Sequence, residues 1–118
     1  MTRILKAFRY SFKGLVAAFG SEPAFRQEVA LFIVAAPIAF FLPVGMVARA
    51  ALVSSLFLIL MAELVNTAIE VIVDRISLER HPLSGRAKDI GSALVLVAFA
   101  NAAVVWSLVL IELLPIKI

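Results

Sequence analysis

Three polar side chains interrupt an otherwise apolar stretch in the middle of this sequence. Glu63, Asn66 and Glu70 follow one another at spacings of three and four residues, so a helix would place all of them on one face. Charged groups at the centre of a membrane-spanning helix cost about 2.5–3.5 kcal/mol each on insertion scales. Because such groups mark functional sites by default, this face is predicted to carry chemistry.

Further acidic residues are expected near the same end of the protein. Glu22 and Glu28 flank the start of an earlier apolar segment, and Asp74 follows Glu70 by one helical turn. A shallow carboxylate there can share a hydrated Mg²⁺ ion with phosphates, because Mg²⁺ favours one or two carboxylates plus substrate oxygens. Glu63 lies about two turns deeper than Glu70. A carboxylate at that depth could act as a general base on a group carried by a lipid.

The composition indicates a membrane protein. Apolar residues make up 64% of the 118-residue chain, against about 45–50% in soluble domains. The length allows one membrane domain, residues 1–118. The chain has no cysteine, which excludes disulfides, thiol nucleophiles and thiolate metal sites. The net charge is +3. Since the basic residues flank apolar segments, anionic lipid headgroups rather than nucleic acid are the expected partner.

Four helical segments would position the polar residues. Residues 1–20 are predicted to form an amphipathic helix on the membrane surface, the alternative being an ordinary helix packed on the bundle. Basic residues are spread through this segment, so a cleavable signal peptide is not expected. Ser21 is a predicted helix cap, with Pro23 in the following first turn. Membrane-spanning helices are predicted at about 25–42, 47–73 and 90–114. The last is rich in small residues, which allow close helix contact.

The distribution of lysine and arginine predicts the orientation in the membrane. Basic residues concentrate before the first span and in the charged loop over residues 76–89. The loop between the first and second spans holds only Arg49, and the C-terminal tail only Lys117. The N-terminus and the loop of residues 76–89 are therefore expected on the cytoplasmic side, and the C-terminus on the far side.

Several single residues allow two interpretations. His81 could contact a nucleotide or be merely solvated. Arg86 and Lys88 could hold phosphates, although juxtamembrane basic residues usually serve topology. Asn66 could have a purely structural role, in which it bonds to a neighbouring helix. Trp106 could likewise serve just for packing or as an anchor at the membrane interface. There is no Gly-x-x-x-x-Gly-Lys-[Ser/Thr] loop and no protein-kinase signature, so any use of ATP must occur without a standard nucleotide fold.

The sequence resembles a known family along essentially its whole length. The Glu-x-x-Asn-x-Ala-Ile-Glu run of residues 63–70 and the Ser-Gly-Arg-Ala-Lys-Asp run of residues 84–89 are similar to motifs of the prokaryotic integral-membrane diacylglycerol kinases. The resemblance implies transfer of the γ-phosphoryl group of MgATP to the hydroxyl of 1,2-diacylglycerol, giving phosphatidic acid. It also implies a homotrimer in the bacterial inner membrane, with a periplasmic C-terminus and active sites between subunits at the cytoplasmic interface.

The resemblance also implies roles for individual residues. Glu63 matches the family's general base, and Glu22 and Glu70 match its metal-binding carboxylates. The positions that would contact the ATP and Mg²⁺ cofactors are Arg3, Tyr10, Glu22, Glu70, Glu79, His81, Lys88 and Asp89. The candidate lipid-binding residues are Ser11, Arg26, Glu28, Arg49, Asn66, Ser92 and Trp106.

Other functions stay open from the sequence. Related members phosphorylate undecaprenol in place of diacylglycerol. A proton or ion relay through Glu63 and Glu70 is a non-enzymatic alternative, but residues 52–61 contain only Ser54 and Ser55 as polar side chains, which counts against a continuous conduit. A purely structural subunit would not explain why carboxylates cluster at one end.

Overall fold

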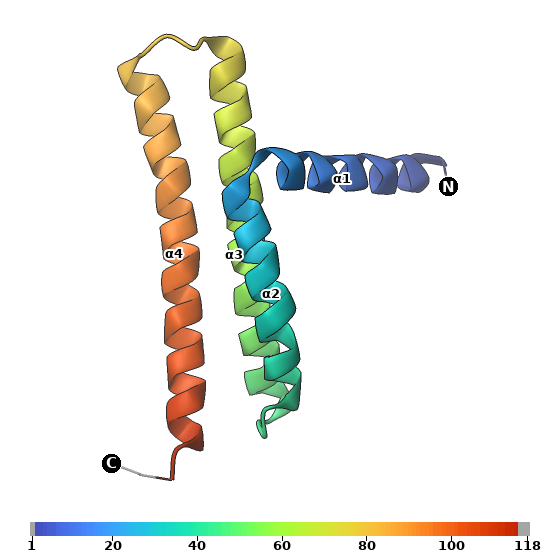
Figure 1. The fold of residues 1–118 in the computed structure, drawn as a ribbon, viewed down its shortest axis with the longest axis vertical. Coiled ribbons are helices and arrows are strands. Elements are labelled where there is room, and N and C mark those ends of the chain that lie inside the picture. The colour runs from blue at the N-terminus through green and yellow to red at the C-terminus, as the bar shows by residue number, and fades with distance from the viewer. Residues whose placement is uncertain (1, 116–118) are drawn as a thin grey trace.

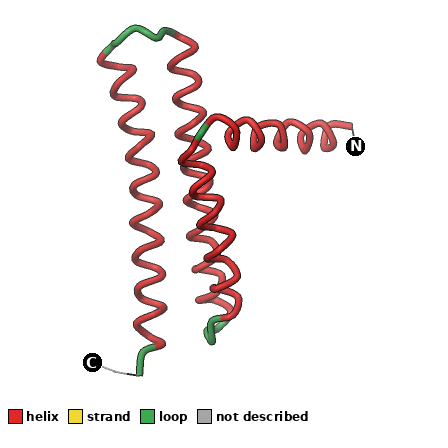
Figure 2. The backbone as a smooth tube through the Cα atoms, in the orientation of Figure 1, coloured by secondary structure: helices red, strands yellow, loops and turns green. Residues whose placement is uncertain are grey.

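The computed structural model describes residues 2–115 and consists of four helices joined by short turns (Figure 1). The helices are α1 (Thr2–Ser21), α2 (Pro23–Phe41), α3 (Met46–Ile76) and α4 (Pro82–Leu113). Over these described residues the backbone is helical apart from its turns and contains no strand (Figure 2). The predicted all-α fold is confirmed, and α2, α3 and α4 are each long and apolar enough to cross a membrane.

The helices form a bundle with one projecting arm. Helices α2, α3 and α4 run side by side, while α1 leaves the start of α2 at a steep angle and points away from the bundle (Figure 1). The turn between α3 and α4 extends beyond the level of α1, and the turn between α2 and α3 lies at the opposite end (Figure 1). The junction of α1 and α2 therefore lies beside the half of α3 that holds the polar residues.

Small side chains let α3 and α4 pack closely along their length. The buried core of this pair contains Ile59 and Ala62 from α3 and Ala98 and Ala102 from α4. Gly91, one further small residue of α4, is also buried. The close helix contact predicted from the small residues of the third span is thus confirmed at these positions.

A side-chain hydrogen bond joins α3 and α4 in the half of the bundle away from the carboxylates. The indole Nε1 of Trp106 donates to Ser55 Oγ at 3.1 Å, and Ser55 Oγ in turn donates to the carbonyl of Leu52 at 2.6 Å. Ser55 is only 1% exposed. The bond provides the partner that an indole N–H needs inside an apolar bundle, so Trp106 packs between helices in this structure.

Arg49 holds the turn between α2 and α3. Its Nε donates to the carbonyl of Ala39 at 3.2 Å, and its Nη2 donates to the carbonyls of Leu42 and Val44 at 2.8 and 3.2 Å. The carbonyl groups that end a helix have no intrahelical partner, and one guanidinium with five donors satisfies several of them. The structure therefore places Arg49 at the end of the bundle opposite the carboxylates.

The start of α4 differs from the sequence prediction. The helix begins at Pro82 rather than near Ile90, so residues 84–89 lie on a helix and not in a loop. His81 explains the earlier start, because its Nδ1 accepts a hydrogen bond from the backbone N–H of Leu83 at 3.1 Å and so caps the helix. Pro82 suits the first helical position, where its missing N–H costs nothing.

The other boundaries need smaller corrections. Helix α1 includes Ser21, and Glu22 rather than Ser21 is the N-cap of α2, with Pro23 in the first turn as predicted. Helix α3 ends at Ile76, three residues later than predicted. The predictions also covered Met1 and residues 116–118, which lie outside the described residues.

The hydrogen bond between Trp106 and Ser55 yields a stability prediction. Substituting Ser55→Ala leaves the indole N–H unpaired in an apolar interface, and is expected to lower the free energy of unfolding by about 0.6–1.7 kcal/mol. The exposed neighbour Ser54 supplies the matched control, Ser54→Ala, which should leave stability unchanged. Unfolding by denaturing detergent in mixed micelles measures both variants. Equal stability of the two would mean that the bond contributes nothing.

Candidate functional site

Helix α3 presents its three predicted polar residues on one buried face. Glu63 is 5% exposed and Asn66 is 8% exposed, while Glu70 is half-buried. The amide Nδ2 of Asn66 donates to Glu70 Oε1 at 2.9 Å, as the spacing of four residues on a helix allows. The sequence-based placement of these side chains on a shared face is therefore confirmed by the structure.

Two carboxylates of α2 complete an acidic cluster around Glu63. Glu28 is buried, and its Oε2 has no hydrogen-bond partner among the described residues. Glu22, the N-cap of α2, makes no side-chain capping bond. The negative charges of Glu22 and Glu70 act on Glu63, and the charge of Glu63 acts on Glu28. Four carboxylates from two helices thus gather beside the junction of α1 and α2, an arrangement that favours a cationic or proton-donating occupant.

The donor set fits Mg²⁺ better than a metal held entirely by protein. No three His, Cys, Asp or Glu side chains within residues 2–115 form a ready metal-binding cluster. Mg²⁺ requires no such cluster, because it usually takes one or two carboxylates and completes its octahedron with water and substrate phosphates. Glu22 and Glu70, both only partly buried, can supply oxygens while remaining open to the aqueous side.

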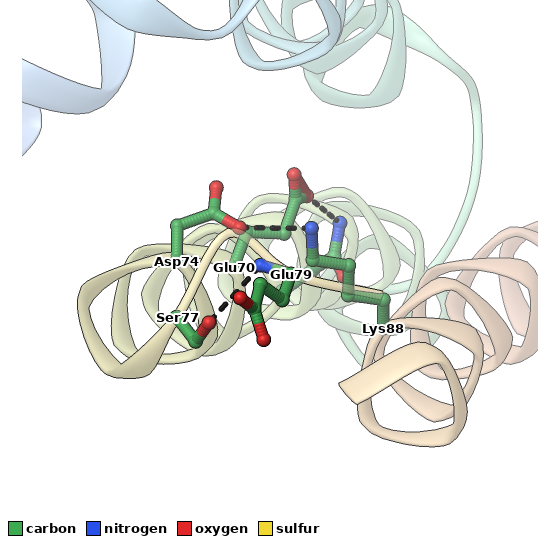
Figure 3. A network of polar contacts seen from close by, with 6 residues as sticks. Glu70, Asp74, Ser77, Glu79 and Lys88 are labelled. Carbon is green, nitrogen blue, oxygen red and sulfur yellow. Dashed lines mark hydrogen bonds and ion pairs between the residues drawn. The ribbon is translucent and has the colours of Figure 1, made fainter. Parts of the chain in front are cut away.

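A cationic side chain lies next to these carboxylates, at the α3–α4 end of the bundle. Lys88 reaches from α4 to Asp74 on α3, where Nζ and Oδ1 are 2.9 Å apart (Figure 3). Both side chains are about half exposed, at 45% and 47%. Glu70 lies one turn earlier on α3, and its charge acts on Lys88. The ammonium group is therefore available to an incoming anion and does not need to leave a buried site.

A cavity of about 500 Å³ lies beneath the turn between α3 and α4. Asp74, Ser77, Glu79, His81 and Lys88 are among the residues that line it. The backbone N–H of Glu79 donates to Ser77 Oγ at 3.0 Å, which shapes the turn (Figure 3). The cavity brings together three side chains predicted from the sequence to contact a nucleotide, namely Glu79, His81 and Lys88.

Other predicted nucleotide residues are not brought to this cavity within one chain. Arg3 and Tyr10 lie on the projecting helix α1, and the Tyr10 side chain is 63% exposed. Asp89 follows Lys88 on α4 and is exposed. In the figure, the start of α1 lies far from the α3–α4 turn (Figure 1). A single chain thus provides part of the predicted nucleotide set in one place.

The predicted lipid-binding residues are not brought together in one place by the single chain. Glu28 and Asn66 lie in or beside the acidic cluster, whereas Arg49 and Trp106 make bonds in the opposite half of the bundle. The remaining three residues lie elsewhere on the helices. Arg26 Nη1 donates to the carbonyls of Phe19 and Gly20, Ser11 Oγ donates to the carbonyl of Ala7, and Ser92 is exposed on α4.

The structure also identifies a residue that sequence analysis treated only as small. Gly91 lies directly against Asn66, so closely that a Cβ atom at this position would overlap Asn66 Oδ1. The signal that could have found it is the antiparallel register of α3 and α4, which pairs position 66 with position 91. Sequence periodicity alone does not provide the register between two helices.

Comparisons with known proteins show which family the chain belongs to. A family model described as "Prokaryotic diacylglycerol kinase" matches residues 9–110. The diacylglycerol kinase of Escherichia coli (strain K12) is 50% identical over 109 residues, covering 92% of this chain and 89% of that protein. The diacylglycerol kinase of Pseudomonas aeruginosa is 50% identical over 111 residues, covering 94% and 90%, and that of Haemophilus influenzae is 43% identical over 106 residues, covering 90% of each. The chain belongs to the prokaryotic diacylglycerol kinase family.

Proposed function

We propose that this protein is a lipid kinase of the bacterial membrane that transfers the γ-phosphoryl group of ATP to the hydroxyl of 1,2-diacylglycerol, giving phosphatidic acid. Family membership supports a lipid kinase. The structural observation that carries the proposal is the position of Glu63, a buried carboxylate within an apolar helix, on the same face as Glu70, whose charge acts both on Glu63 and on Lys88. The residues that we propose as general base, metal ligands and phosphate-binding cation thus all lie toward one end of the bundle.

Glu63 would take the proton from the lipid hydroxyl as it attacks the terminal phosphorus of ATP. Glu63 is only 5% exposed and lies on an apolar helix, which supports a position for it on the lipid side of the site, where a diacylglycerol headgroup would approach from the membrane. Phosphoryl transfer requires little covalent help from the protein, because positioning and charge stabilisation supply most of the acceleration. The reaction also needs a group that accepts the hydroxyl proton, and a carboxylate within reach of the hydroxyl can do so.

The phosphates of ATP would lie between Lys88 and the shallow carboxylates. Lys88 would bind the phosphate oxygens and stabilise the charge that develops during transfer. Glu22 and Glu70 would hold Mg²⁺, which supplies charge neutralisation at the phosphates when bound. The cavity beneath the α3–α4 turn would take the nucleobase between Glu79 and His81. Arg3, Tyr10 and Asp89 would add nucleotide contacts.

The lipid substrate would be held mainly by residues near Glu63. Glu28 and Asn66 are the predicted lipid-binding residues that lie beside it, and Ser92 lies one residue after Gly91, which touches Asn66. In this proposal Arg49 and Trp106 contribute by keeping the helices in register, because their polar groups are already bonded within the bundle.

We further propose a homotrimer of single-domain chains with sites shared between subunits. Large apolar side chains remain exposed along all three candidate spans of the isolated chain, and α1, the helix that contains Tyr10, points away from the bundle. A neighbouring subunit would cover such faces and bring the missing nucleotide contacts. The number three rests on the family resemblance. The N-terminus and the α3–α4 turn would be cytoplasmic and the C-terminus periplasmic.

In the same proposal α1 is an amphipathic helix lying on the cytoplasmic membrane surface. Leu5, Phe8 and Phe12 are each more than 60% exposed in the single chain, and the neighbouring residues include Lys6 and Arg9. Apolar side chains on such a helix insert at the headgroup boundary while basic residues contact anionic lipids. The steep angle between α1 and α2 is compatible with this placement (Figure 1).

The substrate assignment is tested by offering two lipids. Radiolabelled phosphate transfer from MgATP should be measured in mixed micelles that contain diacylglycerol or undecaprenol. Label in phosphatidic acid is the expected result. Label only in the polyprenyl product would overturn the diacylglycerol assignment and retain the kinase chemistry. Absence of label in both lipids, from folded and oligomeric protein, would refute the kinase proposal and turn attention to a proton relay.

Removing the proposed base should slow turnover strongly without unfolding the protein. Glu63→Gln keeps the shape of the side chain but cannot accept the hydroxyl proton, so kcat is expected to fall by about 10²–10⁴-fold. Glu112→Gln is the matched control, because Glu112 is exposed near the end of α4. Lipid phosphorylation at equal ATP and lipid concentrations compares the two. Wild-type turnover by Glu63→Gln would remove Glu63 from the mechanism.

Removing the phosphate-binding cation should weaken both ATP binding and transfer. Lys88→Met is expected to lower kcat/KM for ATP by about 10²–10³-fold, a loss typical of removing one group that stabilises transition-state charge. Lys6→Met removes a positive charge from exposed α1 and provides the control. Steady-state kinetics at varied ATP concentration measures both. If the two variants behave alike, net charge rather than a phosphate contact accounts for the effect.

A further inference from the structure

We propose that Gly91 is a positioning residue of this kinase, which acts through Asn66 to orient the carboxylate of Glu70. The inference rests on the proposed function, in which Glu70 holds the metal ion that accompanies ATP. Gly91 lies on α4 and Glu70 on α3, so a residue of one helix would set the geometry of a ligand on the other.

The missing side chain of Gly91 leaves space for the side chain of Asn66. A Cβ atom at this position would overlap Asn66 Oδ1, and would lie 3.3 Å from Asn66 Cγ and 3.6 Å from Ile69 Cδ1. No described glycine has a positive φ, so backbone conformation does not demand glycine here. The other four glycines have open space where a Cβ atom would lie: Gly14, Gly20, Gly45 and Gly85.

The contact with Gly91 determines where the Asn66 amide lies. Asn66 is 8% exposed, its Nδ2 donates to Glu70 Oε1 at 2.9 Å, and its Oδ1 has no hydrogen-bond partner among the described residues. The opposite amide orientation would place Oδ1 against a carboxylate oxygen, where two acceptors repel each other. With the NH₂ group facing Glu70, Oδ1 occupies the space that Gly91 leaves vacant.

A methyl group at position 91 would disturb this arrangement. The amide of Asn66 would have to move away from α4, and the bond to Glu70 would lengthen or break. Glu70 already interacts with the charge of Lys88, so a released carboxylate would turn toward that ammonium group. Both a proposed metal ligand and a proposed phosphate ligand would then be misplaced, although neither had been substituted.

Metal affinity provides the first test. Binding of Mn²⁺ in the presence of the non-hydrolysable ATP analogue AMPPNP should be followed by electron paramagnetic resonance in micelles, without lipid substrate or turnover. Gly91→Ala is expected to weaken Mn²⁺ binding by about 10–100-fold, as for loss of an outer-shell partner of a metal ligand. Gly14→Ala, at a helical glycine with open space, should leave the affinity unchanged. Unchanged affinity in folded Gly91→Ala protein would overturn the proposal.

A double-mutant cycle separates positioning from helix packing. Asn66→Ala removes the amide without adding a methyl group, and should weaken Mn²⁺ binding about as much as Gly91→Ala does. Adding Gly91→Ala to Asn66→Ala should cause no further loss, because the overlapping atoms are gone. An equal loss from Gly91→Ala in both backgrounds would mean that it acts through helix packing, and would overturn the proposal. The Asn66→Ala result decides the same question if Gly91→Ala does not fold.

The two proposals fail in different ways. If the unmodified protein phosphorylated no lipid, the proposed function would be wrong whatever the variants bind. If the unmodified protein were an active kinase and Asn66→Ala bound Mn²⁺ normally, the positioning role would be wrong and the kinase assignment would stand.

Discussion

The need to satisfy polar groups away from water governs most of this structure. An unpaired polar group costs several kcal/mol in hydrocarbon. The two ends of the bundle differ in how many of their buried polar groups have hydrogen-bond partners. At the α2–α3 turn, Arg49 bonds to three carbonyls. At the other end Glu28 and Asn66 each keep a buried oxygen without a partner in the described chain. Thr67 Oγ1 is a third such oxygen. Glu28 and Asn66 belong to the set of residues that we propose to bind the lipid substrate.

The contact between α3 and α4 transmits one register along the whole bundle. Trp106 meets Ser55 in one half, alanine side chains meet in the middle, and Gly91 meets Asn66 near the carboxylates. Lys88 then meets Asp74 just beyond. The packing residues and the charged residues of α3 and α4 therefore lie along one shared interface.

The depth of each polar residue matches the chemistry assigned to it. Glu63 is buried within an apolar helix, Glu70 is half-buried, and Lys88 and Asp74 are about half exposed at the turn. This gradient suits a reaction that joins a substrate from the membrane to one from water. In the proposed function the group that would approach a lipid hydroxyl is the most buried, and the groups that would meet a hydrated nucleotide are the most exposed.

The sequence by itself determined that the chain forms helices and that one face of α3 carries its polar residues. A 3.6-residue period places Glu63, Asn66 and Glu70 on one face, and long apolar runs need no tertiary information to be recognised as spans. The sequence did not predict the early start of α4, because residues 82–89 have a charged composition typical of a loop. The helix starts there in the structure because the backbone N–H of Leu83 donates to His81. Only the tertiary structure decided which residues of different helices meet. Three contacts depend on the register between helices: that of Gly91 with Asn66, that of Lys88 with Asp74, and that of Arg49 with the carbonyls at the end of α2. This register arises from side-chain packing and is not encoded in the period of either helix alone.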